Sequence, residues 1–281
     1  MPHSDMTVKE IFEKTVKLFE EAGVDSPAFE VSVMLEDLLS LPRNPEVTAK
    51  ETVLSSEQEE KFLAEAQKRA EGYPLQYIIG NWEFFGRKFF VGEGVLIPRP
   101  ETELLCEVVL KYFSRTMPPK VVDLCSGSGC IAITVAKELS GADVSAVELY
   151  DGAFGYLEKN NILHQNCVKT LQRDALEAFG EFDCVVSNPP YITGQEMTEL
   201  QKEVTFEPET ALFGGDDGLD FYRAISENWF GHIRSGGLIA FEIGDTQGEE
   251  VKDILLKNGY KNACVMQDYE GRDRVVTAIK E

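Results

Sequence analysis

The residues with the most distinctive chemistry are the run Ser-Asn-Pro-Pro-Tyr-Ile at positions 187–192. This run follows an apolar stretch, residues 182–186, that predicts a buried parallel strand. Each proline fixes its own φ and removes a backbone N–H. The run therefore presents carbonyl oxygens and few donors. Asn188 adds a side-chain carbonyl, and Tyr191 adds a flat apolar face with a polar tip.

Such a loop suits a planar group that carries an –NH2. Two acceptors can take its two hydrogens, so that the remaining lobe of the nitrogen faces an electrophile. As the nitrogen attacks, it gains positive charge that the fixed carbonyl dipoles stabilise. The reaction needs no general base, because the proton can leave after transfer. The alternative is a tight turn capped by Asn188, and so short a motif leaves both interpretations open.

A second group of residues predicts a nucleotide-like cofactor. Gly127 and Gly129 lie between a predicted strand and helix, where a ligand can approach the backbone and the helix N-terminus favours negative charge. Asp123 ends that strand. Glu148 ends the next strand, where a carboxylate can accept both hydroxyls of a ribose. Asp174 follows the third strand and either meets an adenine amine or caps a helix.

The elements that position these residues alternate between strand and helix from residue 120 onward. The pattern predicts a doubly wound, mostly parallel α/β sheet with an antiparallel edge. The expected strands are 121–124, 144–149, 168–171, one that includes 184–186, 238–243, and a closing hairpin of 263–267 and 274–279. The expected helices are 102–112, 130–139, 153–164, 219–230 and 249–257.

The first part of the chain predicts a small helical domain over residues 1–72. Apolar residues at helical spacing indicate helices over 7–22, 26–41 and 55–70, with a loop over 42–52 and a capping box from Ser56 to Glu59. Residues 73–98 are expected to form a β-hairpin linker, and residues 99–281 a second domain. Arg99, between two prolines, is expected to pair with Glu101 or Glu103.

Composition narrows the function classes. The 281 residues are 43% hydrophobic, without an apolar run near the ~20 residues of a membrane span. The N-terminus does not resemble a signal peptide. Six cysteines without a C-x-x-C pair predict reduced, mostly buried thiols and a cytoplasmic protein. Three scattered histidines argue against a metal site. A net charge of −22 argues against a protein that binds duplex DNA through its phosphates, and it suits a basic protein partner.

Several of these runs together resemble a known enzyme family. Residues 120–139, Glu148, Asp174 and 188–192 are similar to class I, Rossmann-like methyltransferases that use S-adenosylmethionine. The whole chain resembles the PrmC/HemK family, which methylates the glutamine side-chain nitrogen in the Gly-Gly-Gln loop of class I peptide chain release factors, in translation termination. The matching runs are 74–80, 95–103, 186–192, 206–208, 211–212, 217–220, 242–244, 247 and 273–276. The run Ile-Pro-Arg-Pro-Glu-Thr-Glu is more specific than Asn-Pro-Pro-Tyr, which adenine methyltransferases share.

The resemblance implies roles for individual residues. Glu148 would hold the ribose of S-adenosylmethionine, and the turn of Asp174 and Ala175 would border the adenine. Asn188 and the Pro189 carbonyl would accept hydrogen bonds from the substrate amide. The N-terminal helices would help to dock the release factor. The implied cofactor-binding residues are Asp123, Cys125, Ser126, Gly127, Ser128, Gly129, Glu148, Asp174, Ala175 and Asn188. The implied substrate-binding residues are Asn188, Pro189, Pro190 and Tyr191, of which Asn188, Pro189 and Tyr191 would be catalytic.

The sequence departs from the family pattern at two places: Cys125 replaces a common glycine, and Glu148 replaces the more usual aspartate.

Two other functions are compatible with parts of this sequence. A nucleic-acid amino-methyltransferase, acting on adenine N6 or cytosine, could use the same loop. The acidic balance and the lack of an Arg- and aromatic-rich target-recognition segment count against it. A non-catalytic binding protein could keep the same fold. The intact cofactor carboxylate and acceptor loop count against that alternative.

Overall fold

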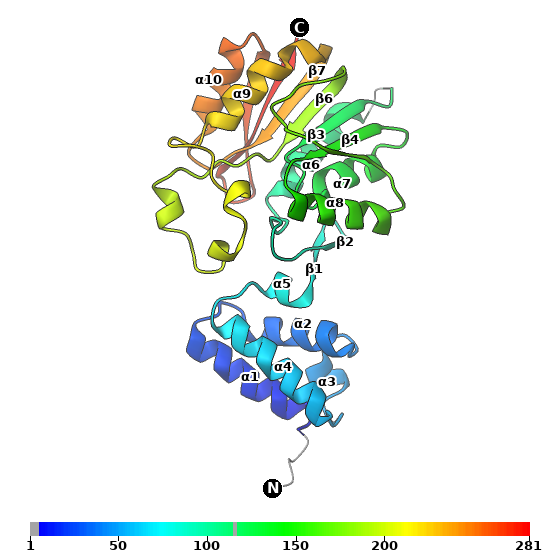
Figure 1. The fold of residues 1–281 in the computed structure, drawn as a ribbon, viewed down its shortest axis with the longest axis vertical. Helices are drawn as coiled ribbons and strands as arrows, with labels where there is room; N and C mark the ends of the chain where they lie inside the picture. The colour runs from blue at the N-terminus through cyan, green and yellow to red at the C-terminus, as the bar shows by residue number, and fades with distance from the viewer. Residues whose placement is uncertain (1–5, 115–116) are drawn as a thin grey trace. The chain divides into compact units, whose positions relative to one another are not determined.

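The computed structural model describes residues 6–114 and 117–281 (Figure 1). The chain divides into two compact units. One unit comprises Met1–Asn81 with Gln201–Phe206, and the other comprises Trp82–Leu200 with Glu207–Glu281. The helical unit therefore extends past residue 72 and also takes in a segment from far along the chain. The predicted hairpin linker over residues 73–98 also differs from the structure. Residues 75–79 form a helix, and the hairpin begins only at Asn81.

The helical unit packs its apolar stripes into one core, where Ile11, Phe19, Met34, Leu35 and Phe62 are fully buried. Its helices are α1 (Val8–Ala22), α2 (Pro27–Leu39), α3 (Pro45–Thr48), α4 (Ser56–Ala70) and α5 (Leu75–Ile79). The short helix α3 replaces part of the expected loop, with a proline in its first turn.

The helix ends explain where the elements begin and stop. Thr7 forms a capping box with Glu10 at the start of α1, and Gly23 ends that helix in the left-handed region at φ 77°. The capping box of α4 is formed by Ser55 and Gln58. The predicted pair of Ser56 and Glu59 was therefore wrong by one residue.

An ion pair holds the distant segment in the helical unit. The Arg69 guanidinium, only 4% exposed, contacts the Glu30 carboxylate at 2.5 Å and the Glu203 carboxylate at 2.7 Å. Tyr73 and Phe206 add an edge-to-face ring contact with centroids 5.2 Å apart. A buried arginine needs such partners for its donors. This requirement accounts for the place of Gln201–Phe206 in this unit.

The second unit contains a seven-stranded sheet in the order β5-β4-β3-β6-β7-β9-β8 (Figure 1). The strands β5 to β7 run parallel, and β9 and β8 form the antiparallel edge. The predicted doubly wound sheet is therefore confirmed. Its strands are β3 (Lys120–Leu124), β4 (Asp143–Glu148), β5 (Lys169–Gln172), β6 (Phe182–Ser187), β7 (Ile233–Glu242), β8 (Lys261–Gln267) and β9 (Asp273–Lys280).

Helices cover both faces of this sheet. Since successive strand residues point to opposite faces, neighbouring residues of one strand belong to different cores. Val121 belongs to the core cluster beneath α6 (Thr102–Phe113), α7 (Cys130–Glu138) and α8 (Asp151–Leu163). Val122 belongs to the cluster beneath α9 (Asp220–Trp229) and α10 (Gly248–Lys257).

Shorter elements join these layers. The predicted hairpin is present as β1 (Asn81–Phe84) and β2 (Arg87–Phe90). Short 3-10 helices, which the sequence did not predict, occupy Glu196–Thr198, Val204–Phe206, Glu209–Ala211 and Phe230–His232.

All six cysteines are free, but only Cys106, Cys130 and Cys184 are buried. Cys125 and Cys167 are partly buried and Cys264 is exposed, so the expectation of mostly buried thiols holds for half of them. Within residues 6–114 and 117–281, no helix has the length and apolarity that a membrane crossing requires.

Candidate active site

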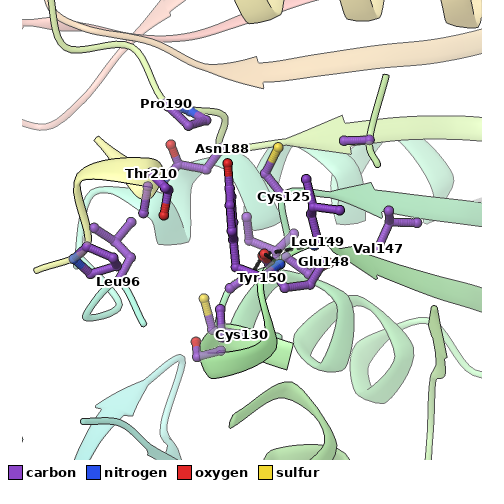
Figure 2. A pocket seen from close by; sticks show the side chains of 18 of the residues that line it. Leu96, Cys125, Cys130, Val147, Glu148, Leu149, Tyr150, Asn188, Pro190 and Thr210 are labelled. Atoms are coloured by element: carbon purple, nitrogen blue, oxygen red, sulfur yellow. Dashed lines mark hydrogen bonds between the residues drawn. The ribbon is translucent and has the colours of Figure 1, made fainter. Parts of the chain in front are cut away.

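A cavity of about 280 Å³ lies at the carboxyl ends of β3, β4, β5 and β6 (Figure 2). Its walls come from the segments that follow these strands: Cys125–Ser128, Val147–Tyr150, Asp174–Leu176, and Asn188 with Pro190. Adjacent β3 and β6 mark the point where the chain order of the sheet reverses. Ligands of open α/β sheets bind at such a switch point.

The loop after β3 bends tightly toward the cavity. Cys125, Gly127 and Gly129 all lie in the left-handed region, with φ values of 58°, 54° and 81°. A Cβ at Gly129 would come within 2.5 Å of the Leu157 side chain, in a backbone conformation that other residues rarely adopt, so this position favours glycine. Gly129 opens α7 and does not line the cavity, whereas Cys125, Ser126, Gly127 and Ser128 do.

Asp123 supports this loop from beneath. Its buried carboxylate accepts hydrogen bonds from the Ser126 hydroxyl at 2.8 Å and from the Ala132 N–H at 3.2 Å. Burial raises its pKa to about 7. Asp123 does not line the cavity. The structure thus places this predicted cofactor residue behind the loop, where it braces the start of α7.

Cys125 is a non-glycine residue in a conformation that favours glycine, so its backbone is strained. Cys125→Gly and Cys125→Ala both remove the thiol, but only alanine keeps the Cβ. We expect the glycine variant to be more stable than the alanine variant by about 1 kcal/mol in urea unfolding. Equal stability of the two variants would show that the backbone at this position carries no such strain.

Glu148 is the best-positioned carboxylate in the cavity. Its Oε2 accepts the Gly127 N–H at 2.9 Å, and its Oε1 accepts the N–H groups of Leu149 and Tyr150 at 2.9 and 3.0 Å. These bonds fix both oxygens at the end of β4. Each carboxylate oxygen has two acceptor sites, so capacity remains on Oε2 for a ribose hydroxyl. The site therefore fits the nucleoside part of S-adenosylmethionine.

Two further segments complete the cavity on this side. The Asp174 Oδ1 accepts the Leu176 N–H at 2.8 Å, which closes a turn. No helix begins there, so the expected alternative of a helix cap is wrong, and Asp174 and Ala175 both line the cavity. The ring of Tyr150 extends from the end of β4 into the cavity (Figure 2), a position that sequence patterns alone did not reveal.

Asn188 lies at the other end of the cavity, directly after β6. Its Nδ2 donates a hydrogen bond to the Thr102 Oγ1 at 3.4 Å. The carbonyl oxygen of the same amide is thereby left as an acceptor for another group. Pro190 also lines the cavity, whereas Pro189 is buried and does not line it.

Tyr191 does not line the cavity. Its ring packs against the core beneath α9 and α10, and burial raises the pKa of its phenol. Its carbonyl accepts the Gln247 Nε2 at 3.1 Å. The structure thus does not bring the Tyr191 ring to the cavity wall, although Tyr191 is one of the residues that the resemblance implies to bind substrate.

Arg99 lines the cavity and pairs with Glu207. The expected partners, Glu101 and Glu103, are both wrong: Glu103 instead accepts the Phe85 N–H at 2.7 Å. Glu207 is buried and also accepts the Ile97 N–H at 2.9 Å. Glu207 thus holds the rigid run around Pro98 against the cavity from a position far along the chain.

The rest of the wall is largely apolar. The remaining lining residues are Gly94, Leu96, Pro98, Thr102, Cys130, Ile131, Ala153, Pro208, Thr210, Ala211 and Phe221. Among the residues that the structure describes, no cluster of three His, Cys, Asp or Glu could hold a metal ion.

Comparisons with known proteins agree with this geometry. The model of the PrmC N-terminal domain matches residues 10–80, and that of the methyltransferase small domain matches residues 101–213. Two bacterial relatives are each named release factor glutamine methyltransferase. The protein from Thermodesulfovibrio yellowstonii is 40% identical over 244 residues, which are 84% of this chain and 85% of the relative. The protein from Koribacter versatilis is 36% identical over 279 residues, 98% and 99% of the two chains.

Solved structures support the fold alone. A methyltransferase from Pyrococcus furiosus matches with a TM-score of 0.53 at 19% identity, over 80% of this chain and 99% of that one. The 16S rRNA N2 G1207 methyltransferase of T. thermophilus, solved with AdoMet and guanosine, matches with a TM-score of 0.52 at 18% identity, over 72% of this chain and 50% of that one. The fold is therefore that of a class I methyltransferase.

Proposed function

The chain belongs to the family of release factor glutamine methyltransferases, and we propose that it methylates the glutamine side-chain nitrogen in the Gly-Gly-Gln loop of class I peptide chain release factors. The observation that carries this proposal is the likeness to such enzymes over nearly the whole chain, including both compact units. The cavity supports it, because a carboxylate and an acceptor loop stand at its two ends.

The proposal assigns each part of the cavity a ligand. The Glu148 carboxylate would accept a ribose hydroxyl of S-adenosylmethionine, and the turn at Asp174 and Ala175 would border its adenine. Residues 125–129 would follow the methionine part, supported from behind by Asp123. Asn188 would face both the cofactor and the glutamine, and Pro189, Pro190 and Tyr191 would shape the substrate loop. Bound S-adenosylmethionine supplies an electrophilic methyl group on a sulfonium.

The protein's own part in the reaction is to orient and stabilise. The Asn188 side-chain oxygen, which lines the cavity, would accept one N–H of the glutamine carboxamide. The carbonyl of the next residue, Pro189, which does not line the cavity in the absence of substrate, would accept the other. This orientation turns the nitrogen toward the methyl group. The same oxygens stabilise the positive charge that develops on the nitrogen. The two prolines contribute no N–H that could compete for these acceptors.

The partner and location follow from the same proposal. A net charge of −22 suits a basic protein partner. The helical unit would help to dock the release factor. Because release factors act during translation, and because all six cysteines are free, we place the enzyme in the cytoplasm.

A labelling assay tests the proposed substrate. With tritiated S-adenosylmethionine, we expect label on a release factor and none on DNA. A release factor whose loop glutamine is replaced by alanine serves as the control and is expected to stay unlabelled. Label on DNA would instead support an adenine amino-methyltransferase that uses the same Asn-Pro-Pro-Tyr loop.

A further inference from the structure

Glu242 is a buried carboxyl beside the active site that the proposed reaction does not use. It ends β7, one residue beyond the paired Phe241 and Ser187, and Asn188 follows Ser187 on the neighbouring strand. Glu242 is 2% exposed and does not line the cavity. Its Oε2 has no hydrogen-bond partner among the described residues. Burying a carboxylate oxygen without a hydrogen bond costs free energy, so the presence of Glu242 at this position points to a functional role.

Thr102 connects Glu242 to Asn188. This residue opens α6, is 2% exposed and touches the cavity. Its side chain interacts with the Glu242 carboxyl and lowers the pKa of that group, and its Oγ1 accepts the Asn188 Nδ2–H at 3.4 Å. All three side chains thus form one chain that runs from the sheet interior to the cavity.

The hydrogen-bonding capacity of the three side chains decides which of them donates and which accepts. An ionised carboxylate can only accept hydrogen bonds, and a hydroxyl has a single proton to donate. The Thr102 proton therefore goes to Glu242, which leaves a lone pair of its oxygen facing Asn188. Only the NH2 end of the Asn188 amide can bond to that lone pair.

We propose that Thr102 and Glu242 are positioning residues that hold the Asn188 amide with its NH2 toward Thr102 and its oxygen toward the substrate carboxamide. This inference rests on the proposed function. The two ends of an asparagine amide are nearly identical in shape, so only hydrogen-bond partners distinguish its two orientations. In the flipped orientation Asn188 would present N–H donors to the N–H groups of the glutamine, and the substrate would lose its acceptor.

Protonation of Glu242 should reverse the donor and acceptor roles along these three side chains. Burial is the main cause that raises its pKa, to about 7, while Thr102 and Arg274 act in the opposite sense. A protonated Glu242 could donate to Thr102, whose own proton would then turn to the Asn188 oxygen. The other groups that act on Glu242, or on which it acts, are Arg99, Glu101, Cys106, Cys130, Tyr191 and Tyr222. Arg99 and Arg274 also have their own carboxylate partners, Glu207 and Asp268.

Paired variants test the proposal with a release factor as substrate. Thr102→Val and Glu242→Leu remove the hydroxyl and the acceptor, and each is expected to lower kcat at least ~10-fold, with the Kd of S-adenosylmethionine changed less than ~3-fold. Thr102→Ser keeps the hydroxyl and should retain most of the turnover. Glu242→Gln carries N–H donors as a protonated carboxyl carries O–H, so its turnover should stay at the low level that the wild type shows at acidic pH.

The pH profile gives a second readout that does not depend on the apolar variants folding. The wild-type kcat is expected to fall as the pH drops below about 7, and Glu242→Gln should lose that fall. An unchanged profile in Glu242→Gln, or an equal loss in Thr102→Ser and Thr102→Val, would overturn the inference. A wild-type enzyme that leaves release factors unmethylated would instead overturn the proposed function, so the two failures are distinguishable.

Discussion

Replacing Asn188 with alanine is expected to lower kcat on a release factor by about 10²-fold or more, the scale of removing one oriented polar group from a reaction centre. The variant loses the acceptor that orients the substrate carboxamide, while Glu148 and the loop after β3 stay in place. The Kd of S-adenosylmethionine should therefore change little. Tritium transfer measures the first quantity, and isothermal titration calorimetry measures the second.

Two controls sharpen this prediction. Gln267→Ala removes an amide from the exposed strand β8, away from the cavity, and should leave kcat unchanged. Asn188→Asp keeps an acceptor but loses the N–H that bonds to Thr102. It should fall well below the wild type, because the donated hydrogen bond sets the orientation. Near-normal turnover of Asn188→Ala would remove this residue from the mechanism.

Replacing Glu148 with alanine is expected to weaken the binding of S-adenosylmethionine by about 10²-fold or more. A hydrogen bond to a charged group contributes up to about 3 kcal/mol, so the loss of the ribose contact on Oε2 accounts for that factor. The alanine variant also leaves the N–H groups of Gly127, Leu149 and Tyr150 without their acceptor, so its Tm should fall. Calorimetry and thermal unfolding measure the two effects.

Glu148→Asp is the matched variant, because it keeps the carboxylate and shortens its stem by one methylene. We expect its Kd to stay within roughly 10-fold of the wild type, since a carboxylate acceptor remains for the ribose. If Glu148→Ala bound the cofactor as tightly as Glu148→Asp, the carboxylate would have no part in holding the ribose.

Much of the second unit could be predicted because its signals are local. The parallel strands are short apolar runs such as Val121 and Val122, whose side chains are buried on both faces of the sheet. Glu148 could be assigned to the cavity because it ends a strand next to the glycine-rich loop. Asn188 followed from the same logic, since the carboxyl ends of parallel strands meet at one edge.

The features that sequence patterns missed depend on partners far along the chain. The Arg99 guanidinium pairs with Glu207, although Glu101 and Glu103 are nearer in sequence. Glu207 is buried and is held in place by the Ile97 N–H. Arg69 similarly pairs with Glu203, which is distant in sequence but belongs to the same helical unit.

The orientation of Asn188 was another such feature. It depends on Thr102 and Glu242, which are distant from it in sequence. Tyr191 points inward because its ring packs against the core beneath α9 and α10, and Gln247 donates a hydrogen bond to its carbonyl.

The most direct test of the central claim is a crystal structure of the enzyme with S-adenosylhomocysteine and a release factor bound. We expect the Asn188 Oδ1 to lie about 3 Å from the nitrogen of the loop glutamine, with Nδ2 still on Thr102. An Asn188 side chain turned away from that nitrogen, with the glutamine bound in the cavity, would contradict the account.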